Sequence, residues 1–235
     1  MIKIETYLED YLYNDIMEAF YMDNIEQFKY GYKASNFYAW DCCYRGFKRV
    51  LKATDSSKPN IERLCFSLIK YLREWGMYSR NATAVVNHFT CSKYRNIVID
   101  IITNYGDLAD MSLEEWVGSK DKKERVKKLY DNIKIDKNKQ IKISNTLKSK
   151  ILLATLGCMP AYDNNVKTAF CEMFSAENSI SIIEKVSRLA GIFKDINLIN
   201  YPIIKILKDM GHPDMKIMDF CLFFYGKHLN DLKNK

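Results

Sequence analysis

Residues 144–170 read SNTLKSKILLATLGCMPAYDNNVKTAF, and this stretch is the clearest guide to the fold. Its apolar side chains recur at helical spacing, so it predicts a helix that Ser144 caps and that Gly157 closes. Pro160 suits the first turn of a following helix, because a helix leaves that N–H without a partner. The stretch therefore predicts two helices around a Gly-to-Pro turn, with Asp163 near the start of the second.

The same helical period recurs on both sides of this window, and only 4 prolines and 9 glycines interrupt the chain. Asn60 can cap one further helix, and Ser112 with Glu115 fits a capping box. Ile141–Ile143 alternates too briefly for more than one isolated strand. We therefore predict an all-α fold of roughly ten helices forming one unit over residues 1–235. A junction between two helical sub-domains is expected near 112–144. The further helices are expected around residues 2–12, 37–51, 61–72, 84–88, 97–102, 112–117, 180–191, 201–210 and 215–226.

The composition excludes several classes of protein. Hydrophobic residues make up 48% and charged residues 28% of the 235 residues, which is typical of a globular chain and excludes a disordered one. The 7 cysteines are odd in number and lack CxxC spacing, which favours reduced thiols and a cytoplasmic protein. No signal peptide is apparent, and no apolar run approaches the roughly 20 residues of a membrane helix, so we expect no membrane partner.

The positive charge is concentrated in one segment. The chain has 36 Lys+Arg and 29 Asp+Glu, a net charge of +7, but residues 118–150 alone hold 12 basic and four acidic residues. Such a cluster attracts phosphates, which favours a nucleic-acid partner, with DNA as the expected one, although a solvated helix face has the same pattern. Arg80, in the break that follows Trp75, is a separate candidate for binding an anion. The candidate phosphate-binding residues of the basic segment are Lys120, Lys123, Arg125, Lys127, Lys142 and Lys148.

Other chemistries have little support in the sequence. His88 and Cys91 have the spacing of one half of a zinc site, but the second pair of ligands is missing, so we expect no metal. Cys158 could act as a nucleophile only beside a base such as His88, and a buried structural cysteine is the simpler interpretation. Phosphate-binding glycine motifs and the GxSxG elbow are absent, so no cofactor is expected.

The window Thr146–Phe170 resembles the helix-hairpin-helix superfamily of base-excision DNA glycosylases around its catalytic aspartate. The resemblance covers about 25 residues: an apolar helix, a small-residue turn, Pro160, then Asp163. It implies an all-α protein with two helical sub-domains in which Asp163 is the catalytic carboxylate. The glycine-rich hairpin of the family is replaced by residues 136–144, which contain no glycine.

The lysine that gives some members lyase activity aligns near Thr146, and Lys148 is out of register. The resemblance therefore implies a monofunctional N-glycosidic bond hydrolase or a relative without activity. Residues 75–81 and 153–163 also resemble a widespread group of uncharacterised bacterial all-α proteins, which implies no function. Two alternatives stay open: a non-enzymatic helical module that binds nucleic acid, and a protein-interaction module in bacterial stress or phage defence.

Overall fold

The structure is a computed structural model, and it describes residues 3–19, 33, 35–53, 59–77, 90–134, 143–174, 180–196 and 201–234. These ranges contain twelve α-helices, one short 3-10 helix and no strand, which confirms the predicted all-α class. Ile143, the described end of the short alternating segment, is not in a strand. No helix in the described ranges is long and apolar enough to cross a membrane.

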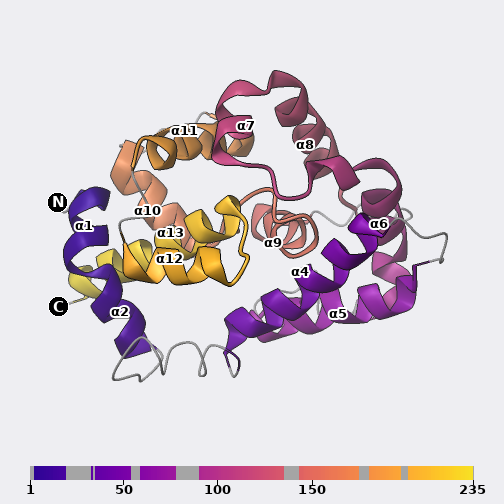
Figure 1. The fold of residues 1–235 in the computed structure, drawn as a ribbon, viewed down its shortest axis with the longest axis horizontal. Helices are drawn as coiled ribbons and strands as arrows, with labels where there is room; N and C mark the ends of the chain where they lie inside the picture. Colours follow the sequence, from indigo (N-terminus) through magenta and orange to yellow (C-terminus); the bar gives the residue numbers. More distant parts are fainter. Residues whose placement is uncertain are drawn as a thin grey trace.

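The α-helices are short to medium in length, from 6 residues in α7 to 20 residues in α13 (Figure 1). In chain order they are α1 (Ile4–Asp10), α2 (Leu12–Ala19), α4 (Asn36–Lys52), α5 (Ile61–Glu74), α6 (Cys91–Asn104), η2 (Gly106–Leu108), α7 (Leu113–Gly118), α8 (Lys120–Asn132), α9 (Asn145–Thr155), α10 (Asn164–Phe174), α11 (Ile182–Asp195), α12 (Pro202–Asp209) and α13 (Asp214–Lys233).

Helix α9 is at the centre of the fold (Figure 1). Most of its side chains are buried, including polar Ser149 and Lys150, as expected for a helix covered on several sides. Helices α4, α5 and α8 pack against it. The indole N–H of Trp40 donates to the carbonyl of Leu153 at 2.9 Å, which fixes α4 on α9 through a hydrogen bond made inside the core.

Helix α13 organises the other part of the core, where α1, α2, α10 and α12 pack against it. Gly226 permits the close approach of α10, because a Cβ atom at this position would stand 1.9 Å from the carbonyl oxygen of Asn165. The chain termini lie near each other beside α1 and α13 (Figure 1).

The predicted helix ends are confirmed at several positions. The Asn60 side chain accepts from the Arg63 N–H at 2.9 Å, and Ser144 accepts from the Leu147 N–H at 3.2 Å. Ser112 makes the predicted capping box with the third residue of α7. Gly157 has a positive φ of 59°, which suits its place just after α9.

Two local predictions are wrong. Residues 2–12 do not form one helix, because the chain breaks at Tyr11 between α1 and α2. Pro160 does not begin a helix: α10 begins at Asn164, and the residues before it form an irregular loop. Side chains of α13 and α9 accept from the N–H groups of Ala161 and Tyr162, and these two hydrogen bonds hold the loop in its irregular path.

Helices α7 and α8, which lie within the region 112–144, contact helices that are distant in the sequence. Helix α7 packs against α11, and α8 packs against both α9 and α11. The single unit over 1–235 and the sub-domain junction near 112–144 stay predictions.

Candidate functional site

Asp163, the carboxylate singled out from the sequence, lies at the N-terminus of α10 and is half-buried. Its Oδ1 accepts a hydrogen bond from the Val166 backbone N–H at 3.1 Å, the geometry of an N-cap. A carboxylate at a helix N-terminus also interacts favourably with the helix dipole. Asp163 thus has a structural role, and the groups around it decide whether it can have a chemical one.

Lys150 is the cation that the fold places near Asp163. Its side chain projects from α9 and is only 4% exposed. The ammonium stands 3.5 Å from the Trp75 carbonyl oxygen and 4.9 Å from the centre of the Trp75 ring, a cation–π contact. Burial lowers the pKa of Lys150, while the nearby carboxylates of Asp163 and Asp219 oppose this shift.

A second pair of charges completes the group. In α13 the ammonium of Lys216 lies 2.8 Å from Oδ2 of Asp219, and both side chains are buried. The other oxygen of Asp219 accepts from the Ala161 N–H at 2.8 Å. We call Lys150, Asp163, Lys216 and Asp219 the buried charge cluster. With two cations and two carboxylates, the cluster is balanced in formal charge.

The surroundings of the cluster raise the pKa of Asp163. Burial makes the largest contribution, and repulsion from Asp219 adds to it. The ammonium of Lys150 and the N–H groups of Val166 and Asn165 act in the opposite direction. A carboxyl group with a raised pKa, within electrostatic reach of a cation, is typical of the acid–base groups that enzymes use.

Backbone hydrogen bonds hold the loop before Asp163 in place. The Tyr162 N–H donates to Oγ of Ser149 at 2.7 Å, and the Thr146 hydroxyl donates to the Tyr162 carbonyl at 2.9 Å. Together with the bond from Ala161 to Asp219, these contacts fix the loop to both α9 and α13. Asp163 is therefore positioned by the core rather than by a mobile connection, as catalytic groups require.

Cationic side chains also surround the neighbouring Tyr162. The ammonium of Lys185 in α11 donates to the Tyr162 hydroxyl at 3.0 Å. The ammonium of Lys167 in α10 lies 5.6 Å from the centre of the same ring. Both lysines are half-buried, so they add positive charge around Tyr162 that the sequence did not single out.

The predicted phosphate-binding residues of α8 differ in their availability. Arg125 binds the carboxylate of Asp107 and donates to the Asn104 carbonyl at 2.8 Å. Lys127 lies 3.4 Å from Asp131, in an exposed pair of the kind that contributes little. The Lys123 ammonium donates to the Val117 carbonyl at 3.3 Å, and the Lys120 side chain is exposed.

The structure does not bring Lys148 and Asp163 together. The ammonium of Lys148 lies 5.0 Å from the centre of the Tyr130 ring, and its charged neighbours are Asp131 and Lys134. Lys142 and Arg80 lie outside the described residues.

Sequence reasoning missed Lys150, Lys216 and Asp219 as members of a site. The signal was present: Lys150 lies among the apolar residues of α9, and Lys216 and Asp219 are one turn apart in an otherwise apolar segment of α13. A charged residue on an apolar helix face is rare unless it has a partner.

The cysteines give no second site. Four of the seven thiols are buried, and burial raises the pKa of Cys158 to about 12, which opposes formation of a nucleophilic thiolate. His88, its suggested partner, lies outside the described residues. Within the ranges that the structure describes, no group of three or more His, Cys, Asp or Glu side chains could hold a metal ion.

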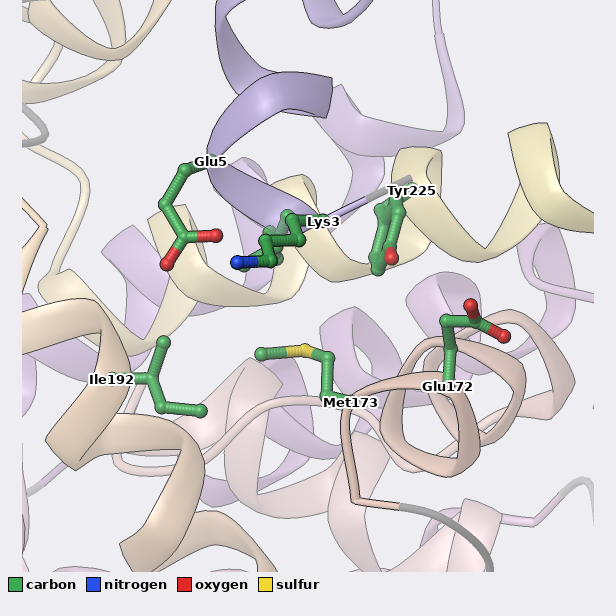
Figure 2. A pocket seen from close by; sticks show the side chains of 7 residues that line it. Lys3, Glu5, Glu172, Met173, Ile192 and Tyr225 are labelled. Atoms are coloured by element: carbon green, nitrogen blue, oxygen red, sulfur yellow. The ribbon is translucent and has the colours of Figure 1, made fainter. Parts of the chain in front are cut away.

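A separate pocket of about 280 Å³ lies among α1, α10, α11 and α13 (Figure 2). Glu5 and Glu172 stand on different walls, Lys3 lies beside Glu5, and Tyr225 lies toward Glu172. Burial raises the pKa of Tyr225 to about 12, and the negative charge of Glu172 adds to this effect. The residues around this pocket do not include any member of the buried charge cluster.

The chain was compared with protein-family models, curated proteins and solved structures, and none of them matched.

Proposed function

We propose that this protein binds DNA and hydrolyses the N-glycosidic bond of a flipped nucleotide, with Asp163 as the reacting carboxylate. One observation carries the proposal: the carboxyl group of Asp163, held by the Val166 N–H and half-buried, interacts electrostatically with the buried ammonium of Lys150. The resemblance of residues 146–170 to helix-hairpin-helix glycosylases supports the same assignment. The unpaired cysteines fit a cytoplasmic enzyme.

The chemistry follows from the charge that develops in the reaction. Cleavage of the bond between C1′ and the base nitrogen leaves positive charge on the sugar, which the Asp163 carboxylate stabilises. A water oxygen bonds to C1′, and one of its protons passes to Asp163. The base departs with the bonding electron pair and takes a proton from solvent. Lys150 opposes the raised pKa of Asp163 and thereby helps to keep its carboxylate ionised before the reaction.

Recognition of DNA requires phosphate contacts and a base taken out of the stack. We propose that the segment 118–150 supplies the phosphate contacts. Lys120 and Lys127 are the best candidates on α8, since both are exposed, whereas the guanidinium of Arg125 is bound to Asp107. Lys167 and Lys185 add positive charge around Tyr162, the residue before Asp163.

The direct test measures base release from duplexes that carry single damaged, mismatched or modified bases. Asp163→Asn removes the charge but keeps an oxygen that can cap α10, so the fold should be retained. We expect this variant to lower the rate of base release by about 10²–10⁴-fold. Asp195→Asn, at an exposed position at the end of α11, is the matched control and should act like the wild type. An unchanged rate in Asp163→Asn, or no release by the wild type from any duplex, would refute the proposal.

The N-cap geometry of Asp163 favours one alternative, in which this carboxylate only stabilises α10 and the protein binds nucleic acid without reaction. In that case DNA affinity should fall steeply with salt, since phosphate contacts release counterions. Base release should then be absent at any protein concentration. The protein-interaction alternative instead predicts DNA affinity no better than millimolar and a protein partner recovered by the basic segment.

A further inference from the structure

Helices α4 and α5 lie side by side and enclose an open groove of about 550 Å³ that the proposed reaction does not use. The N-terminus of α4 meets the C-terminus of α5, where the Trp75 indole donates to the Asn36 carbonyl at 3.1 Å. The two helices are therefore antiparallel, and each forms one wall of the groove. Arg45 and Arg49 line it from α4, and Arg63 and Lys70 line it from α5.

The groove is strongly basic. Its lining contains these four cations and no carboxylate. Arg45 is bound to Asp41 at 2.8 Å, which leaves most of the positive charge to the other three side chains. Over the described ranges, no carboxylate lies within ion-pair distance of Arg49, Arg63 or Lys70. A concave surface of one charge sign concentrates ligands of the opposite sign.

The spacing of the cations fits a chain of anions better than a single anion. Arg63 and Lys70 are seven residues apart on α5, so their Cα atoms are about 10 Å apart along the helix axis. Phosphates of one strand repeat about every 3.4 Å along the axis of a B-form duplex and are farther apart in an extended strand, so a strand can place more than one phosphate over this length. Two cations this far apart can each bind a different phosphate of the same strand.

The floor of the groove is narrow and largely apolar. Gly46 has no side chain there, and a Cβ atom at this position would stand 3.7 Å from a methyl group of Leu64. Val50 and Leu64 supply apolar surface between the cations. Sugars and bases can lie on such a surface while guanidinium groups bind the phosphates on either side.

We propose that the groove between α4 and α5 binds a single strand of nucleic acid through its phosphates. The site is separate from the basic segment 118–150 and from the buried charge cluster. This inference rests on the proposed function only in that both need a nucleic-acid ligand, and it does not depend on any reaction at Asp163.

The test uses the full chain and fluorescence anisotropy of a labelled 12-nucleotide single-stranded DNA. The charge reversal Arg49→Glu with Arg63→Glu should weaken binding at least tenfold. It should also reduce the magnitude of the salt slope by about 1.4, since each phosphate contact on a single strand contributes about 0.7. Lys194→Glu with Lys205→Glu makes the same change of charge at exposed positions on α11 and α12, and should stay within threefold of the wild type. Circular dichroism checks the fold, and Arg49→Gln with Arg63→Gln serves if the reversal unfolds the protein.

Two results would overturn the inference: equal affinity of the groove and control variants, or displacement of the DNA by an equally charged acidic peptide as readily as by unlabelled DNA. The outcomes for groove and reaction can be told apart. If groove variants lose binding and the wild type releases no base, the groove proposal stands and the reaction proposal fails. If base release occurs and groove variants bind normally, the reaction proposal stands and the groove proposal fails.

Discussion

Replacement of Asp219 by asparagine isolates the charge of this residue within the buried charge cluster. Asp219→Asn keeps an oxygen that can accept from the Ala161 N–H, a bond of 2.8 Å in the wild type. It removes the negative charge that faces the Lys216 ammonium at 2.8 Å. The side chains of Lys216 and Asp219 are only 3% and 7% exposed, so water cannot take the place of the lost carboxylate.

The expected cost follows from the burial of Lys216. Removal of one partner of a buried ion pair typically costs about 3–5 kcal/mol, because a desolvated charge is left without compensation. A loss of about 4 kcal/mol lowers the folding equilibrium constant roughly 1,000-fold. The double variant Lys216→Met with Asp219→Asn removes both charges, so no unpaired charge is left in the core. We expect it to lower the free energy of unfolding by less than about 2 kcal/mol. The double variant should therefore be more stable than the Asp219→Asn single variant.

Urea unfolding followed by far-ultraviolet circular dichroism measures both changes, provided that the slope of the free energy with urea is the same in all variants. The surface pair Lys127 and Asp131, 3.4 Å apart and well exposed, gives the control: Asp131→Asn should cost less than about 1 kcal/mol. The reasoning is refuted if Asp219→Asn costs less than about 1 kcal/mol, or if the double variant is no more stable than the single one.

Three further predictions concern single positions. Burial and nearby cations lower the pKa of His212 to about 3. Between pH 3 and 6.5 the unfolded chain therefore binds more protons than the folded one, and stability falls as the pH falls through this window. Between pH 7.5 and 5.0 the wild type should lose about 2 kcal/mol more than His212→Asn, measured by urea unfolding at both pH values; equal losses would contradict this. Gly226→Ala places a methyl group 1.9 Å from the Asn165 carbonyl oxygen, so it should lower the free energy of unfolding by at least about 3 kcal/mol, despite the better helix propensity of alanine. An unchanged melting temperature would show that α10 and α13 can separate without cost. Ser112→Ala removes the capping box with Glu115 and should cost about 1 kcal/mol in urea unfolding, whereas Ser112→Thr should restore most of it.

The sequence predicted helices and many of their ends because these depend on neighbouring residues. Ser144 and Ser112 each bond to a backbone N–H three residues later, and Gly157 adopts the positive φ that glycine favours. The basic character of α8 was likewise visible in the sequence. Asp163 was proposed as the catalytic carboxylate from a resemblance that spans only about 25 residues.

The loop before Asp163 could not be predicted, because its conformation depends on distant side chains. Pro160 is compatible with the start of a helix, and local preference alone favours that interpretation. The carboxylate of Asp219, 58 residues later than Ala161, accepts from the Ala161 N–H and ties the loop to α13. Oγ of Ser149 accepts from the Tyr162 N–H and ties the loop to α9.

The sequence by itself thus determined the helical class, the helix caps and the location of the basic segment, since each of these follows from residues within one or two turns. Only the tertiary structure decided that Lys150 and Lys216 share one desolvated region with Asp163 and Asp219. It also decided that Arg49 and Arg63, in separate helices, line one groove. The physical reason is that the pKa of a group depends on which elements bury it, and the charge of a groove depends on which helices line it. Both are fixed by packing between segments that are distant in the sequence.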